Sequence, residues 1–218
     1  MTSQPPPFEI AIIGGGISGL VLTIALLARS ESLPLKIKVY EAAQHFAEIG
    51  AGVAFSPNAL RAMELCSPDI SAAYEKVATT NLRPEKKGTW FDFLDGMGPE
   101  AVGQGKWLFD LTNSLGQNAV HRAHFLDELV KLVPDGSAEF GKRLESIDED
   151  ASNGRLKLAF HDGSSAEADA VIGCDGIKSR VRAILYGEDH PSTHPVYCLL
   201  YTSPSPRDRT RSRMPSSA

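Results

Sequence analysis

Three glycines near the amino terminus have the spacing of a dinucleotide-binding turn. Gly14, Gly16 and Gly19 form a G-x-G-x-x-G pattern directly after an apolar segment. In such a turn the first glycine allows the tight bend, the second lets a pyrophosphate approach the backbone, and the third permits close helix–strand packing. The phosphates bind the N–H groups at the start of the helix, where the helix dipole favours anions. Because glycine-rich turns are common, the pattern alone is a weak signal.

A carboxylate follows the turn at the sequence offset expected of a residue that binds a ribose. Glu41 follows the alternating segment Lys36–Tyr40 and comes 22 positions after Gly19, near the expected offset of about 20 residues. Its carboxylate would accept a hydrogen bond from a ribose 2′-hydroxyl and would disfavour a 2′-phosphate. Together the two features predict a dinucleotide site. A surface glutamate after an ordinary βαβ unit is the weaker alternative, and the pattern does not distinguish FAD from NAD.

The elements that position these residues are a strand, a turn and a helix. No charged residue occurs from Ile10 to Ala28, a length that could span a membrane. Four glycines at its centre would weaken such a helix. We therefore expect a buried strand over Phe8–Ile13 and, after the turn, a helix that runs to Arg29. The proline-rich lead before Phe8 has no basic residue and does not resemble a targeting signal.

A second candidate ligand-binding edge lies near residue 175. Leu156–Phe160 and Ala166–Ile172 are expected to form a hairpin around Asp162-Gly163, a strong signal for a two-residue turn. The second strand leads into Asp175-Gly176 and then into the start of a helix. Asp175 would therefore lie at the carboxyl edge of the sheet, where ligands bind in open α/β folds. An Asp-Gly pair taken alone could be only a turn.

The middle of the chain carries a long connection and then a change of pattern. Gln44–Phe55 is expected to be a functional loop, because loops of this length are uncommon in compact domains. A helix is expected to start at Ser56-Pro57 and to end near Cys66. Short strand-like pieces between Ala78 and Asp110 contain both tryptophans. They form either an aromatic wall for a substrate or ordinary β core.

Other polar residues give weaker indications. Arg122 opens a helix with an apolar stripe, and its guanidinium could meet a phosphate or a flavin or simply be solvated. No metal site is expected, because His45, His121, His124 and His161 show no metal-ligand spacing on a common face. The three cysteines are too few and too scattered for a disulfide framework. A reducing, cytoplasmic compartment is the default expectation.

Composition bounds the class of protein, and charge divides the chain. The 218 residues are 42% hydrophobic and 22% charged, which are globular proportions. A net charge of −5 gives no reason to expect a nucleic-acid or membrane partner. Thr202–Ala218 holds four arginines and one acid, so the rest of the chain carries −8. Because Cys198–Asp208 reads like a translated sequencing adapter, we expect residues 198–218 to be a non-native tail. A basic tail that binds RNA is the alternative.

Four motifs in order resemble the group A FAD-dependent aromatic monooxygenases, most closely the fungal salicylate hydroxylase-like enzymes. The resemblance spans residues 8–197, and the motifs are the glycine turn with Glu41, the run Glu48–Ala62, the pair His121-Arg122 and the run Gly173–Arg182. Cys174 stands where alanine is commoner in that family. The resemblance implies an α/β fold, with a Rossmann-like FAD-binding domain of the GR2 type and an inserted, incomplete β-rich substrate domain.

The resemblance also implies domain boundaries. Residues 8–77 and 111–185 would form a discontinuous FAD-binding domain that lacks its carboxyl-terminal part. Residues 78–110 and 186–197 would form the start of the substrate domain. The family continues with a second FAD motif of Gly-Asp-Ala-Ala-His type, which this sequence does not contain. The chain is therefore expected to be an amino-terminal fragment that retains FAD weakly and does not turn over.

The same resemblance implies a role for each site residue. Gly14, Gly16 and Gly19 would hold the FAD pyrophosphate, and Glu41 would bind the adenosine ribose. Ala54 and Arg122 would contact the flavin side, and Asp175 would serve both FAD and the nicotinamide donor. These seven positions are the candidate cofactor-binding residues.

The implied reaction is hydroxylation of a small aromatic substrate, salicylate-like or a polyketide phenol. NADH or NADPH would reduce the flavin, and O2 would supply the oxygen atom. The cofactor carries this chemistry, so no protein nucleophile is expected and no catalytic residue is assigned. The alternative is a non-catalytic FAD- or nucleotide-binding fragment, or a pseudogene product. The sequence does not determine the donor, the substrate or the oligomeric state.

Overall fold

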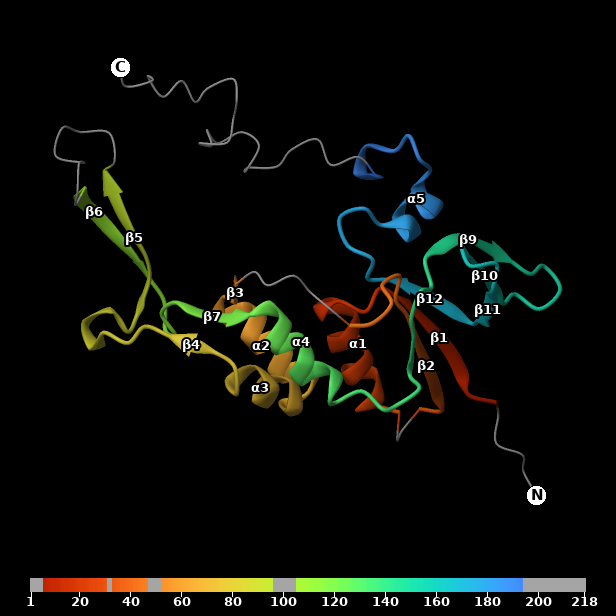
Figure 1. Cartoon of the computed structure of the whole chain (residues 1–218), viewed down its shortest axis with the longest axis horizontal. Helices are drawn as coiled ribbons and strands as arrows, with labels where there is room; N and C mark the ends of the chain where they lie inside the picture. The colour runs from red at the N-terminus through yellow and green to blue at the C-terminus, as the bar shows by residue number, and fades with distance from the viewer. Residues whose placement is uncertain (1–5, 31–32, 47–51, 96–104, 194–218) are drawn as a thin grey trace, which may run out of the picture.

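A parallel four-stranded sheet forms the centre of the computed structural model, which describes residues 6–30, 33–46, 52–95 and 105–193 (Figure 1). Its strands, in spatial order, are β12 (Ala170–Gly173), β1 (Phe8–Ile13), β2 (Leu35–Tyr40) and β8 (Ala138–Glu139). Ile13 of β1 is level with Tyr40 of β2 and with Gly173 of β12. The residues that follow these three strands therefore meet at one edge of the sheet. The expected tail, residues 198–218, lies outside the described residues.

The expected strand, turn and helix at the amino terminus are confirmed. Ile10 to Ile13 of β1 are buried, and Ile12 is fully buried, as expected for a strand covered on both faces. Helix α1 (Ile17–Leu27) follows the glycine turn. Across the described ranges, no helix is both long and apolar enough to cross a membrane.

Four helices form a layer beside this sheet, and α1 joins the layer to the sheet by covering one face of β1 and β2. The four helices are α1, α2 (Pro57–Cys66), α3 (Pro68–Glu75) and α4 (Arg122–Val130), and their apolar faces share a core that includes Leu20, Ile70, Phe125 and Leu129. The sequence correctly predicted α2 but missed α3. That helix begins at Ser67-Pro68, where the Ser67 hydroxyl accepts a hydrogen bond from the Asp69 N–H at 3.2 Å.

Two sequence expectations were wrong in detail. The segment Gln44–Phe55 is not all loop, because β3 (Gly52–Ala54) pairs antiparallel with β7 (Asn118–His121). β7 also pairs with β4 (Thr79–Thr80). The strand expected over Ala166–Ile172 is divided at Asp169.

The division of that strand joins two sheets. β11 (Ser165–Ala168) pairs with β10 (Leu156–Phe160), which pairs in turn with β9 (Leu144–Glu149), whereas β12 pairs with β1. Asp169 lies at the break, where its N–H donates to the Glu9 carbonyl at 2.8 Å and its carboxylate accepts from the Glu9 N–H at 2.7 Å. This exchange with the start of β1 moves the chain from the three-stranded sheet into the central one. β12 then leads into α5 (Arg180–Tyr186).

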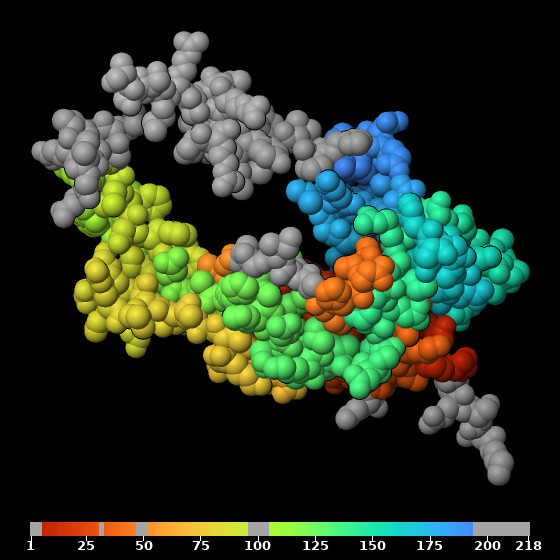
Figure 2. All heavy atoms as spheres, in the orientation of Figure 1, coloured from red at the N-terminus to blue at the C-terminus, as the bar shows by residue number. Residues whose placement is uncertain are grey.

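The aromatic segment forms a separate hairpin that projects from the rest of the molecule (Figure 2). It consists of β5 (Thr89–Asp95) and β6 (Lys106–Thr112), which pair antiparallel. The Phe93 and Phe109 rings stack with centroids 4.5 Å apart, yet these side chains are 42% and 50% exposed. The ordinary-core interpretation is therefore wrong for the described residues. The substrate wall stays a prediction.

A cluster of charges around Arg155 holds the two sheets together. Its guanidinium pairs with Glu9 of β1 and, at 3.2 Å, with Asp169. Hydrogen bonds from Lys36 and then from Arg155 hold the pKa of Glu9 below its ordinary value. A carboxyl group whose pKa is lower in the folded state stabilises the fold above its unfolded-state pKa, and this contribution disappears as the pH falls.

We expect Arg155→Met to lower the free energy of unfolding by about 1 kcal/mol at pH 7. The difference from the wild type should narrow below the ordinary pKa of a glutamate, about 4.3, because protonated Glu9 no longer gains from Arg155. Urea unfolding at pH 7 and at pH 3.5 measures both values. Arg83→Met removes an exposed arginine and serves as control. An equal difference at the two pH values would contradict the assignment to Glu9.

Candidate functional site

A cavity of about 550 Å³ opens at the carboxyl edge of the central sheet. Its volume is in the range of small-molecule sites. Five of the seven candidate residues line it, namely Gly14, Gly16, Glu41, Arg122 and Asp175. They come from the ends of β1, β2 and β12 and from the start of α4, so residues far apart in the sequence meet here. The other two, Gly19 and Ala54, do not line the cavity.

The glycine turn forms the floor of the cavity. Gly14 has φ +104°, and a Cβ there would lie 2.5 Å from the Cys174 carbonyl oxygen, so this position requires glycine. Gly16 precedes α1, and among the described residues, apart from Gly16 and its two chain neighbours, no atom lies within 4 Å of the place where its Cβ would be. The space that a side chain would fill is open toward the cavity. A pyrophosphate group fits such a cradle at a helix amino terminus.

Gly19 acts on the turn rather than on the cavity. A Cβ at Gly19 would lie 1.9 Å from the Gly14 carbonyl oxygen. Only glycine therefore allows α1 to approach the turn this closely. The packing places the first N–H groups of α1 beside the cavity.

Two backbone groups hold the carboxylate of Glu41 at the end of β2. Its Oε2 accepts a hydrogen bond from the Gly15 N–H at 2.6 Å, and its Oε1 accepts one from the Ala43 N–H at 2.7 Å. Each carboxylate oxygen can accept a further hydrogen bond. The carboxylate could therefore accept a hydrogen bond from a ligand hydroxyl, and its role with a ribose stays a prediction.

Asp175 has one oxygen in use and one without a partner. Its Oδ2 accepts from the N–H groups of Arg180 and Val181 at 2.6 Å and 3.0 Å, at the start of α5. Its Oδ1 is buried in the cavity wall, with no hydrogen-bond partner among the described residues. A buried acceptor without a partner is costly, so a ligand hydroxyl that donates to Oδ1 would be favourable.

Positive charge exceeds negative charge around the cavity. Against Glu41 and Asp175 stand five cationic side chains: Arg122, Lys142, Arg143, Lys178 and Arg180. The Lys142 ammonium is held 2.8 Å from Asp162 and 2.7 Å from the Ser164 hydroxyl, and it keeps the pKa of Asp162 well below its usual range. The excess of cations attracts an anionic ligand such as a pyrophosphate.

Two further titratable groups in the cavity wall stay neutral at pH 7. Burial, and then Asp175, raise the pKa of the Cys174 thiol. Burial raises the pKa of Tyr40 to about 12, with a smaller contribution from Glu139. A protonated thiol is a poor nucleophile. The cavity therefore binds and positions a ligand and offers no activated nucleophile from Cys174.

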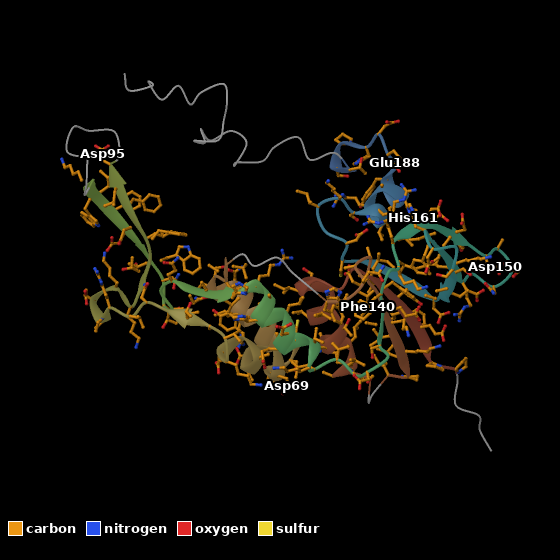
Figure 3. The ribbon with its side chains drawn as sticks, viewed as in Figure 1. Asp69, Asp95, Phe140, Asp150, His161 and Glu188 are labelled. Carbon is orange, nitrogen blue, oxygen red and sulfur yellow. The ribbon has the colours of Figure 1, made fainter. Side chains whose placement is uncertain are left out.

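Sequence reasoning missed one wall of the cavity. Lys142 and Arg143 follow β8, and His161, labelled in Figure 3, follows β10. Their places depend on strand pairing, and no local motif marks them.

The structure bears on two other expectations. Ala54 lies in β3 opposite Ala119, outside the cavity. No common face was predicted for the histidines as metal ligands, and the His121 and His124 rings lie side by side with centroids 4.4 Å apart. The described residues contain no group of three side chains that could hold a metal ion.

The chain is similar to known proteins in sequence. Residues 11–178 match a family model described as FAD-NAD(P)-binding. The chain is 49% identical over 207 residues to 6-methylsalicylate 1-monooxygenase of Aspergillus terreus, a match that covers 93% of this chain and 45% of the relative. It is 40% identical over 199 residues to a salicylate hydroxylase of Sarocladium schorii, with 89% and 40% covered.

A solved structure shows the same fold. The substrate complex of a salicylate hydroxylase superimposes with a TM-score of 0.67 at 32% sequence identity, and the match covers 87% of this chain and 41% of that one. The α/β fold with a Rossmann-type domain is thereby confirmed. The chain spans less than half the length of the relatives that it matches.

Proposed function

Because this chain belongs to the FAD-NAD(P)-binding family, we propose that it supplies the FAD-binding part of an aromatic-ring monooxygenase. The enzyme would use O2 and NADH or NADPH to hydroxylate a phenolic substrate, salicylate-like or a polyketide phenol. The cavity at the ends of β1, β2 and β12 carries this proposal, because its glycine cradle, its two acids and its excess of cations suit a dinucleotide. The names of the relatives support the substrate class.

The residues of this chain would bind and orient the cofactor. FAD, when bound, supplies the redox chemistry between the donor and O2. The open backbone at Gly16 would receive the pyrophosphate, and Glu41 would accept a hydrogen bond from the adenosine ribose. Asp175 Oδ1 would accept one from a second cofactor hydroxyl. Arg122 would lie toward the flavin, together with Ala54 on the neighbouring β3–β7 pair.

The remaining parts of the proposal concern organisation and location. Residues 8–77 and 111–185 would form the FAD-binding domain, and 78–110 and 186–197 would begin the substrate domain. The exposed aromatic face of the β5–β6 hairpin supports a role in facing an aromatic ligand. Cys66 and Cys174 are free thiols, which supports a reducing, cytoplasmic location.

A second candidate function is FAD binding without turnover. It is supported by the share of the relatives that the chain spans, 45% for the 6-methylsalicylate monooxygenase. The two candidates differ in whether aromatic substrate increases the consumption of the reduced donor.

One experiment separates them. Purified chain is supplied with FAD, and oxidation of NADH and of NADPH is followed with salicylate, with 6-methylsalicylate and with benzoate, which lacks the electron-donating hydroxyl group. For a longer form that includes the carboxyl-terminal half present in the relatives, the monooxygenase proposal expects faster oxidation with the two phenols only, and 18O from labelled O2 in the product. The 218-residue chain itself is expected to bind FAD weakly without turnover. FAD binding with unstimulated oxidation in the longer form would favour the second candidate. A chain that binds no FAD would refute both.

A further inference from the structure

The position between the first two glycines of the turn is also constrained to glycine. Gly15 is buried, and a Cβ there would lie 2.6 Å from Phe46 Cε1 and 3.1 Å from Glu41 Oε2. The dinucleotide pattern leaves this position open to other residues. In this chain a side chain at 15 would collide with the Phe46 ring or displace the Glu41 carboxylate.

The same glycine carries the hydrogen bond that holds Glu41. The Gly15 N–H donates to Glu41 Oε2 at 2.6 Å, and this bond joins the turn after β1 to the residue after β2. The distance between the cavity floor and the carboxylate therefore depends on how closely Gly15 approaches Glu41. The Phe46 ring lies against Gly15 at this point.

Phe46 is itself anchored from two sides. Its ring meets Phe140, labelled in Figure 3, edge to face with centroids 4.7 Å apart and planes at 82°. It also packs against the core shared by the four helices α1 to α4. Neither Phe46 nor Phe140 lines the cavity. The ring is thus held by the core and lies against the glycine turn at Gly15.

The backbone around Glu41 is fixed in the same way. The Glu41 N–H donates to the Glu139 carbonyl at 2.8 Å, and the Lys142 N–H donates to the Glu41 carbonyl at 2.9 Å. The Gly141 N–H donates to the Ala43 carbonyl at 2.8 Å. With its own backbone held, the Glu41 carboxylate is placed by its hydrogen bonds from the Ala43 N–H and from the Gly15 N–H of the glycine turn.

We infer that Phe46 is a positioning residue for the nucleotide: its ring holds Gly15 against Glu41 and so sets where the carboxylate meets the ribose 2′-hydroxyl. This inference rests on the proposed function, in which Glu41 binds the ribose. The inference leads to one specific prediction. Disturbing the Phe46–Gly15 contact should reduce discrimination by the site for a 2′-hydroxyl, beyond any general loss of nucleotide affinity.

The test compares ADP with 2′-deoxy-ADP on the full chain by titration calorimetry. A hydrogen bond to a carboxylate is strong enough that the wild type should bind ADP about tenfold more tightly. In Gly15→Ala the new Cβ meets Phe46, and the ratio of the two dissociation constants should fall to about one. In the double variant Gly15→Ala with Phe46→Ala the ring is absent, and the ratio should recover to about threefold or more.

Two further variants provide a control and an independent test of the Phe46 ring. Gly88→Ala lies outside the cavity and adds a Cβ whose nearest atom in the described part of the chain is the Asn113 carbonyl oxygen at 3.4 Å, so it should keep the wild-type ratio. Phe46→Leu removes the ring without adding atoms at Gly15, so it remains informative if Gly15→Ala does not fold. Its ratio should fall to about threefold, with a thermal unfolding midpoint close to that of the wild type.

The outcomes separate this inference from the proposed function. An unchanged ratio in Gly15→Ala or in Phe46→Leu would overturn the role of Phe46 and leave the role of Glu41 intact. Failure of the double variant to recover selectivity would also overturn it. A wild type that does not discriminate between the two nucleotides would overturn the ribose role of Glu41, and the inference with it.

Discussion

Replacing Gly19 with alanine is expected to abolish FAD binding and to lower the free energy of unfolding by about 3 kcal/mol. Helix propensity alone predicts the opposite, a gain of about 1 kcal/mol for glycine to alanine inside a helix. Packing decides the sign here, because the new Cβ would lie 1.9 Å from the Gly14 carbonyl oxygen. Backbone cannot yield as a flexible side chain does, so α1 must move away from the turn.

Urea unfolding and quenching of flavin fluorescence measure the two effects of Gly19→Ala. Ser71→Ala introduces alanine into α3, away from the turn, and should leave both nearly unchanged. Wild-type stability together with wild-type FAD affinity in Gly19→Ala would show that the helix does not pack on the turn as described.

Substitutions of Asp175 should distinguish the roles of its two carboxylate oxygens. Asp175→Asn keeps one oxygen that accepts from the N–H groups of Arg180 and Val181. The free energy of unfolding should therefore change by less than about 1 kcal/mol. The amide N–H₂ in place of the buried Oδ1 cannot accept a cofactor hydroxyl, and FAD affinity should fall by about 10- to 100-fold.

Asp175→Ala is the companion variant. It should weaken FAD binding similarly and also lower the free energy of unfolding by about 2 kcal/mol, because two N–H groups at the start of α5 lose their acceptor. The Ser179 hydroxyl still accepts from the Arg182 N–H, so α5 keeps one cap. If Asp175→Asn binds FAD as the wild type does, Oδ1 has no role in the cofactor site.

Local patterns explain which parts of the fold could be predicted. The strand before Gly14, the turn and α1 follow one another in the sequence, so apolar spacing and glycine positions were sufficient. Glu41 was proposed from its offset of 22 positions after Gly19, and the parallel pairing of β1 with β2 brings it to the same edge as the glycine turn. Helix α3 was missed although Ser67-Pro68 repeats the Ser-Pro start that correctly marked α2.

The parts that could not be predicted depend on contacts between distant residues. β3 is three residues long and exists through its pairing with β7, and Asp169 divides a strand because it bonds to Glu9. Lys142 reaches the cavity because β8 pairs with β2. No local spacing records such pairings, since tertiary context selects them.

FAD titration of the wild-type chain, followed by displacement with ADP, tests the central claim most directly. The account predicts saturable binding of one FAD per chain, because the glycine turn, Glu41 and Asp175 meet in one cavity. It also predicts competitive displacement by ADP, because the adenosine diphosphate half of FAD would occupy the cradle at Gly16. Absence of saturable binding, or FAD that ADP does not displace, would contradict it.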